Sequence, residues 1–168
     1  MIRVGQGVDV HGFDDSRPLV LGGVRISDNG GLAGHSDADA VLHAITDALL
    51  GAAGAGDIGQ YFPSDDPRWS GADSAIFIRE AKRLVAEMES EIANVDITII
   101  AQKPKLAPFR DAMRDNIAKL LDLPPGHVNV KATTTDHLGF LGRGEGICAM
   151  AIVAISKDLG TSPIEGAL

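Results

Sequence analysis

The sequence predicts an α+β fold in which helices cover one face of a single sheet. Apolar runs typical of strands stand at both ends and in the middle of the chain, and stretches with helical apolar spacing lie between them. These segments do not alternate strictly as strand, helix, strand, so a doubly wound parallel sheet is not expected. A length of 168 residues, 45% of them apolar, suits one domain with its own core.

The expected elements follow from apolar spacing and from the residues that start and stop them. In chain order they are a strand at 2–10, two short strands within 18–26, helices at 36–53 and 74–91, a strand at 94–101, a helix at 108–121, and strands at 127–133 and 146–156. Ser36 is expected to cap the first helix, with Asp39 as its capping-box partner, and Asp73 to cap the second. Residues 158–168 are expected to form a flexible tail after a domain at 1–157.

Charge and composition disfavour two classes of function. A net charge of −8 repels the phosphate backbone of nucleic acids, although metal ions, lysines or backbone amides could still hold a small phosphorylated ligand. No apolar run approaches the roughly 18 residues that cross a membrane, and the first residues lack the apolar core of a signal peptide. The single cysteine fits a reducing compartment. We therefore expect a cytoplasmic protein that binds neither nucleic acid nor membrane.

The stretch "GVDVHGF" indicates a metal site. Asp9 and His11 are two residues apart in a predicted strand, so both side chains point to one face and the intervening valines to the other. His43 has apolar neighbours at helical spacing and is expected to face inward. Two histidines and one carboxylate with an open fourth position are typical of a catalytic zinc site. The spacing alone also permits a strand-end turn in which Asp9 caps a backbone N–H, and it does not fix which divalent metal binds.

Four further stretches offer ligand-binding chemistry, each with a plainer alternative. "GHSDAD" suits an anion near a helix start, or simple capping. "DIG" and "FPSDD" offer carboxylates for sugar hydroxyls, or form a solvated turn. "AQKPKLAP" is a basic loop that suits a nucleotide, or a solvated connector. "KATTTDHLGFLGRGEG" offers hydroxyls, a cation-binding aspartate and glycines for close backbone approach, or is a connector between strands.

Together these stretches resemble one family. "DVHGF", "LGGVRI", "GLAGHSDADAVLHAITDALLGAAGAGDIGQYFP", "ADS", "NVDITIIAQKPKL" and "VNVKATTTDHLGFLGRGEGI" look like the corresponding parts of the 2-C-methyl-D-erythritol 2,4-cyclodiphosphate synthases, in order and at their spacing, over about residues 2–156. The resemblance implies a homotrimer with active sites between neighbouring subunits. It also implies a lyase of the non-mevalonate isoprenoid pathway, which cyclises 4-diphosphocytidyl-2-C-methyl-D-erythritol 2-phosphate and releases CMP.

The resemblance further implies roles for individual residues. Asp9, His11 and His43 match the zinc ligands. Asp136 matches the residue that holds a second cation, Mg²⁺ or Mn²⁺, where the family usually has Glu. His35 and Thr134 match catalytic positions that orient phosphates. The implied substrate contacts are Asp9, Val10, His11, His35, Ser36, Asp57, Ile58, Gly59, Phe62, Pro63, Ser64, Asp65, Asp66, Ala101, Gln102, Lys103, Pro104, Lys105, Leu106, Ala107, Thr133, Thr134, Thr135, Asp136, Phe140 and Arg143. An isoprenoid diphosphate on the trimer axis, near Phe140 and Arg143, is a further implied partner.

Two other functions remain open. One is a different metal-dependent phosphoryl enzyme on the same scaffold, such as a hydrolase of nucleoside diphosphates. The other is a non-catalytic trimer that binds isoprenoid diphosphates. The complete set of Asp9, His11 and His43 together with Thr133 and Thr134 favours an enzyme over a binding module.

Overall fold

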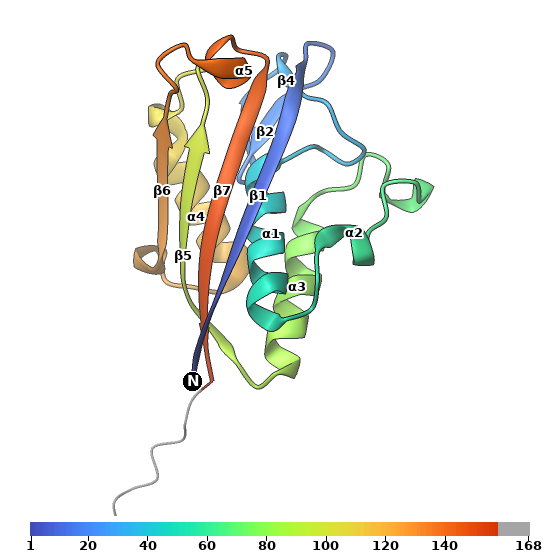
Figure 1. The fold of residues 1–168 in the computed structure, drawn as a ribbon, viewed down its shortest axis with the longest axis vertical. Helices are drawn as coiled ribbons and strands as arrows, with labels where there is room; N and C mark the ends of the chain where they lie inside the picture. The colour runs from blue at the N-terminus through green and yellow to red at the C-terminus, as the bar shows by residue number, and fades with distance from the viewer. Residues whose placement is uncertain (158–168) are drawn as a thin grey trace, which may run out of the picture.

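The computed structural model describes residues 1–157, which form a five-stranded sheet, a separate two-stranded sheet and helices (Figure 1). The strands are β1 (Ile2–Asp14), β2 (Leu19–Leu21), β3 (Val24–Ser27), β4 (Gly31–Leu32), β5 (Glu91–Ile100), β6 (Val128–Thr133) and β7 (Gly146–Ser156). The helices are α1 (Ala40–Ala53), α2 (Ile58–Tyr61), α3 (Ala75–Glu87), α4 (Arg110–Leu121) and α5 (Gly139–Gly142). The large sheet has the order β4-β1-β7-β5-β6, in which only β5 and β6 run parallel.

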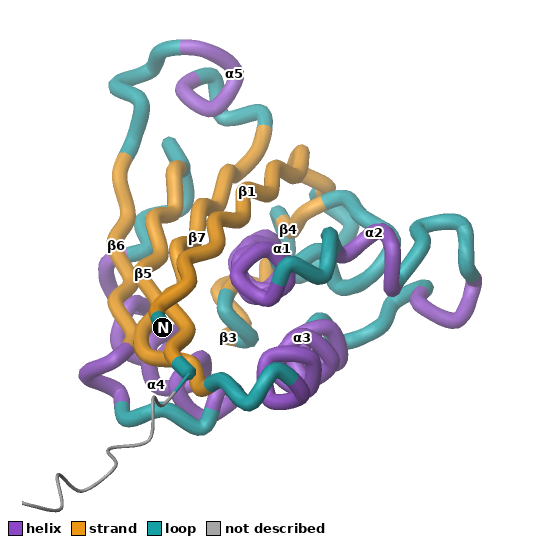
Figure 2. Tube along the Cα trace, turned by 60° about the horizontal axis from the view of Figure 1, so that its bottom comes forward, coloured by secondary structure: helices purple, strands orange, loops and turns teal. Residues whose placement is uncertain are grey.

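The three long helices lie on one face of the large sheet, as the sequence predicts. Helices α1 and α4 pack on the strands and α3 packs beside α1, whereas no helix within residues 1–157 covers the opposite face (Figures 1 and 2). The core between these layers is built from buried aliphatic side chains of α1, β5 and β7. The α+β prediction with helices on one face is therefore confirmed for the described residues.

Two glycines of β1 let α1 approach the sheet unusually closely. A Cβ atom built on Gly5 would lie 1.9 Å from the Ala48 carbonyl oxygen, and one built on Gly7 would lie 1.9 Å from the Ala44 carbonyl oxygen. Real side chains do not tolerate such contacts, so only glycine allows this packing. The backbone of α1 consequently rests directly on β1, and side chains that leave the two elements further along can meet.

Several boundaries differ from the sequence-based expectation. Strand β1 continues past residue 10 to Asp14, because it pairs with β7 as far as Gly12 and then with the unpredicted strand β4. Strand β5 starts at Glu91 rather than at 94. The expected helix at 108–121 begins with a 3₁₀ turn before α4 starts at Arg110. The short helices α2 and α5 lie in segments that carry no helical apolar pattern.

The predicted cap of the first helix is wrong. Helix α1 begins at Ala40, and Asp39, not Ser36, is the N-cap. The Asp39 carboxylate accepts hydrogen bonds from the backbone N–H groups of Val41 (3.1 Å) and Leu42 (3.0 Å). The segment 36–39 therefore stays outside the helix. The second helix starts at Ala75, and its N-cap is Ser74 rather than the predicted Asp73, although Asp73 accepts the Ala75 N–H at 2.8 Å.

Asp39 also ties the hairpin of β2 and β3 to the start of α1. Its buried carboxylate accepts the N–H groups of Gly22 at 2.9 Å and of Gly23 at 2.6 Å. Asp39→Ala is expected to lower the free energy of unfolding by about 2–4 kcal/mol, since a helix cap is lost and backbone donors lose their acceptor. Urea unfolding measures the change. Asp28→Ala, at an exposed ion pair with Arg25, is the control and should cost little; equal losses in both variants would contradict this role.

Two remaining expectations concern the ends of the chain and membranes. The last strand ends at Ser156, as predicted. The predicted tail at 158–168 lies outside the described residues, so its expected flexibility stays a prediction. Within residues 1–157, no helix has both the length and the apolar character needed to cross a membrane.

Candidate functional site

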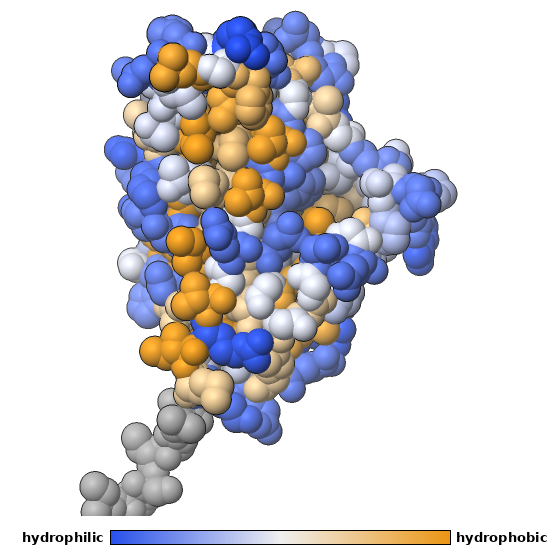
Figure 3. All heavy atoms as spheres, viewed as in Figure 1, coloured by the Kyte–Doolittle hydropathy of each residue, from blue (hydrophilic) through white to orange (hydrophobic). Residues whose placement is uncertain are grey.

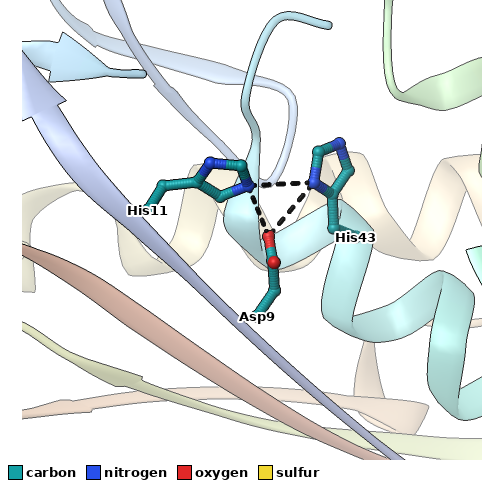
Figure 4. Close-up of side chains that lie close together, drawn as sticks. All are labelled: Asp9, His11 and His43. Atoms are coloured by element: carbon teal, nitrogen blue, oxygen red, sulfur yellow. Dashed lines mark hydrogen bonds and ion pairs between the residues drawn. The ribbon is translucent and has the colours of Figure 1, made fainter. Parts of the chain in front are cut away.

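Asp9, His11 and His43 converge on one point, as predicted (Figure 4). Asp9 and His11 leave β1 on the face that carries α1, and His43 comes from the first turn of that helix. The Asp9 Oδ2 atom lies 2.8 Å from His11 Nε2 and 3.1 Å from His43 Nδ1, and the two nitrogens are 3.2 Å apart. Since β1 continues to Asp14, the alternative of a strand-end turn capped by Asp9 is excluded.

The outward nitrogens of both rings have hydrogen-bond partners. His11 Nδ1 lies 2.6 Å from the carbonyl oxygen of Ala33, which can only accept, so Nδ1 carries a proton and, in the neutral ring, Nε2 keeps a lone pair for a metal ion. His43 Nε2 lies 3.1 Å from the Ser36 hydroxyl and 2.9 Å from the Ser74 hydroxyl. Fixing the outer nitrogen of a histidine in this way is typical of metal ligands.

The three groups fit a tetrahedral metal ion. Bonds of 2.0–2.1 Å at tetrahedral angles place ligand atoms ~3.3 Å apart, close to the observed separations of 2.8–3.2 Å. The side chains are mostly shielded, with exposed fractions of 25% for Asp9, 17% for His11 and 13% for His43. Asp9, His11 and His43 could therefore hold a divalent ion and leave a fourth position for a ligand.

The electrostatics of the cluster favour an ionised Asp9 and a protonated His11. Burial raises the pKa of Asp9, but hydrogen bonds from His11 and His43 and their charges outweigh burial and hold that pKa well below its usual range. Burial lowers the pKa of His11, but the hydrogen bond and charge of Asp9 outweigh it and raise the pKa above 6.5. In the metal-free protein, a proton on His11 Nε2 thus occupies the position that a cation would take.

Metal affinity is expected to fall as the pH is lowered. Below the raised pKa of His11 a metal ion must displace a proton, whereas above it the ring is already free to bind. Competition with a chromophoric chelator at about pH 8 and about pH 6, corrected for the chelator's own titration, measures the change. Equal zinc affinities at the two pH values would contradict the assignment of His11 as a ligand.

A pocket of about 230 Å³ opens over the cluster and collects several predicted residues. Its lining is Asp9, His11, His35, Ser36, His43, Ile58, Gly59, Phe62, Ser64, Trp69 and Phe77. His35 Nε2 lies 3.1 Å from the Asp66 carbonyl oxygen, which places it beside the 62–66 loop. Sequence reasoning missed Trp69 and Phe77. Phe77 lies on α3 among that helix's apolar positions, and this pattern could have identified it.

Other residues predicted for this site do not line the pocket. Asp57 caps α2 by accepting the Gln60 N–H at 3.1 Å. The Asp66 carboxylate binds Arg68 instead of facing the pocket lining. The Val10 side chain is 45% exposed on the bare face of the sheet. Pro63 and Asp65 are exposed and lie outside the lining as well.

A second pocket, of about 290 Å³, brings the basic loop next to the threonines. Its lining is Ala101, Gln102, Lys103, Pro104, Lys105, Leu106, Ala107, Ala132, Thr133 and Thr134. Strands β5 and β6 run parallel, so the segments that follow them meet at the same edge of the sheet. The predicted nucleotide-binding segment and the threonines thus converge. The two pockets share no lining residue.

The segment after β6 stands apart from the metal cluster. Thr134 Oγ1 lies 3.3 Å from the exposed carboxylate of Asp136, which is not part of the Asp9–His11–His43 group. The Thr135 hydroxyl donates to the Leu138 carbonyl oxygen at 2.7 Å. Phe140 is 45% exposed on α5, and Arg143 pairs with Glu145 at 2.6 Å.

Comparisons with known proteins agree with this geometry. A 2-C-methyl-D-erythritol 2,4-cyclodiphosphate synthase from Geobacillus sp. (strain WCH70) is 55% identical over 157 residues, covering 94% of this chain and 99% of that protein. Among solved structures, IspF of Plasmodium falciparum as a CDP complex has a TM-score of 0.82 and 38% identity, covering 93% of this chain and 96% of that one. The bifunctional IspDF of Campylobacter jejuni has a TM-score of 0.89 and 47% identity over 92% of this chain, which spans only 42% of that larger protein.

The family assignment rests on nearly the whole described chain. The model of the YgbB family matches residues 2–156, which include both pockets and the cluster of Asp9, His11 and His43. The resemblance that the sequence motifs indicate is confirmed, and the chain belongs to the YgbB family.

Proposed function

We propose that this protein converts 4-diphosphocytidyl-2-C-methyl-D-erythritol 2-phosphate to 2-C-methyl-D-erythritol 2,4-cyclodiphosphate and CMP, as a lyase of the non-mevalonate isoprenoid pathway. The observation that carries the proposal is the convergence of Asp9, His11 and His43 in a chain that aligns almost end to end with proteins of that name. An oxygen of the 2-phosphate attacks the β-phosphorus, and a P–O–P bridge oxygen leaves with the α-phosphate as CMP. The number of phosphorus–oxygen bonds is unchanged, so no oxidant or water is consumed.

The chain's contribution is positioning and charge. A divalent ion held by Asp9, His11 and His43 would act as a Lewis acid on the diphosphate. His35 and Ser36 line the same pocket and can orient phosphate oxygens. Both reacting groups belong to one substrate, so holding it in a folded conformation supplies much of the rate advantage.

The nucleotide end is proposed to bind in the second pocket. Lys103 and Lys105 offset phosphate charge there, and backbone groups of residues 101–107 can hydrogen-bond the base. Thr134 would orient the diphosphate, and Asp136 would hold a second cation, Mg²⁺ or Mn²⁺, whose charge would offset that of the phosphates. Asp is one methylene shorter than the usual Glu, so this contact could pass through water. The CDP complex of the Plasmodium falciparum protein supports a nucleotide as ligand.

A homotrimer would bring the two pockets together between neighbouring subunits. The bare sheet face carries a continuous apolar stripe (Figure 3), and a monomer rarely exposes so much apolar surface. The exposed apolar side chains of β1 and β7 are Ile2, Val4, Val8, Val10 and Ile152. Phe140 and Arg143 would then lie near the axis, where an isoprenoid diphosphate could bind. We also propose a cytoplasmic location.

Phosphorus NMR of the purified protein with the substrate tests the function. Stoichiometric CMP and a cyclic diphosphate, lost on chelation and restored by zinc plus magnesium, would support it. Release of inorganic phosphate would instead favour a hydrolase, and no turnover with metal present would favour a binding module.

Sedimentation tests the assembly, since a trimer has three times the chain mass of 17.5 kDa.

A further inference from the structure

Ser74 occupies a buried position between His43 and a carboxylate. Its hydroxyl oxygen lies 2.9 Å from His43 Nε2, and its side chain is fully buried. The same hydroxyl donates to Asp37 Oδ1, and the Ser74 N–H donates to Asp37 Oδ2 at 3.0 Å. Ser74 ends the "ADS" stretch, to which neither the sequence nor the proposed function assigns a role.

The protons of this chain of contacts can be assigned. An ionised carboxylate only accepts hydrogen bonds, and a serine hydroxyl has one proton to donate. Since the Ser74 hydroxyl uses its one proton in the hydrogen bond to Asp37, its oxygen can only accept a hydrogen bond from His43 Nε2–H. A neutral imidazole has one N–H, so Nδ1 is left with a free lone pair. That nitrogen is the one that lies 3.1 Å from Asp9 Oδ2, at the centre of the cluster.

The other hydroxyl near the ring cannot fix the proton in this way. The Ser36 hydroxyl lies 3.1 Å from His43 Nε2, but in residues 1–157 it has no carboxylate partner. It could therefore donate as well as accept. Asp37 is itself held in place, because its Oδ1 also accepts the Asp39 N–H at 3.1 Å and its own N–H donates to the Ala72 carbonyl oxygen.

We propose that Asp37 and Ser74 are positioning residues that keep the proton of His43 on Nε2 and aim Nδ1 at the metal ion. The inference rests on the metal-binding part of the proposed function. Without Ser74, the His43 ring loses the oxygen that can only accept its Nε2–H, and it gains freedom to rotate. Without the charge of Asp37, the Ser74 proton is free to turn toward Nε2, which would favour the ring proton on Nδ1 and weaken metal binding. Mutation of a residue that hydrogen-bonds the outer nitrogen of a metal-bound histidine commonly weakens metal binding about 10–100-fold.

Zinc affinity, measured by chelator competition without substrate, tests the proposal. Ser74→Ala and Asp37→Asn are expected to weaken zinc binding about 10–100-fold. Asp73→Asn is the matched control, because Asp73 precedes Ser74, accepts the Ala75 N–H at the start of the same helix and makes no hydrogen bond to a histidine in the described part of the chain. It should bind zinc as the unmodified protein does. Thermal unfolding identifies any variant that fails to fold.

A second readout separates positioning from general destabilisation. In the zinc-loaded protein, the His43 Nε2–H proton is expected to give a slowly exchanging, downfield NMR signal that Ser74→Ala shifts or broadens and Asp73→Asn leaves in place. Zinc affinities of both variants within twofold of the unmodified protein would overturn the proposal. If the unmodified protein binds zinc but makes no cyclic product, the proposed reaction fails. A zinc affinity that depends on Ser74 would still support the positioning role of Asp37 and Ser74.

Discussion

His43→Ala is expected to abolish tight metal binding and CMP release while the chain remains folded. The substitution removes one of three converging ligand atoms, so its effect should exceed the ~10–100-fold loss of affinity that an outer partner causes. His43 is 13% exposed and lies at a pocket wall rather than in the aliphatic core. The fold should therefore survive. Chelator competition and a product assay measure the two effects.

A control identifies indirect causes of such a loss. His127→Ala removes a histidine whose ring hydrogen-bonds the Ala93 carbonyl oxygen at 2.8 Å and which lines neither of the two pockets. This variant should retain zinc binding and activity. Full zinc affinity in His43→Ala would contradict the assigned role. Unfolding of the variant would also contradict it, because His43 would then be a structural residue.

Gly7→Ala is expected to destabilise the protein and to separate the metal ligands. The added Cβ would lie 1.9 Å from the Ala44 carbonyl oxygen and 2.8 Å from the Ala48 nitrogen, so α1 must move away from β1. Overpacking of this kind costs about 1–3 kcal/mol or more. Because His43 is carried by α1 and Asp9 and His11 by β1, the same movement should weaken zinc binding.

Gly12→Ala provides a matched control on the same strand. A Cβ at Gly12 would lie 3.6 Å from the Glu145 carbonyl oxygen, which is an ordinary contact. Denaturant unfolding and zinc competition on both variants measure the two effects. Stability and zinc affinity are expected to fall in Gly7→Ala and to stay unchanged in Gly12→Ala. Unchanged zinc affinity in a folded Gly7→Ala protein would show that close helix packing does not set the ligand geometry.

The metal cluster could be predicted from the sequence because the direction of each ligand side chain follows from the repeat of its own strand or helix. The two-residue repeat of a strand brings Asp9 and His11 to one face, and helical spacing turns His43 inward. The start of α1 could not be predicted as readily. Ser36 and Asp39 are both good capping residues, and only the tertiary contacts of Asp39 with Gly22 and Gly23 decide between them.

The pocket walls depend on contacts that sequence reasoning does not supply. Trp69 and Phe77 approach Phe62 from different elements, with ring centroids 5.0 and 4.5 Å from that of Phe62. Asp66 illustrates the reverse case, because a neighbouring arginine binds a carboxylate that the motif assigns to substrate. In the proposed trimer, contacts between subunits would join the two pockets, and the pattern of a single sequence does not reveal such contacts.

The most direct test of the account is a zinc titration of metal-free protein during turnover. Substrate and excess magnesium are supplied, and CMP release is followed as zinc is added. Without zinc, no CMP release is expected; with added zinc, release should rise linearly and saturate at one zinc ion per chain, with His43→Ala inactive throughout. Full activity without zinc, or saturation at a ratio unrelated to the Asp9–His11–His43 site, would contradict it.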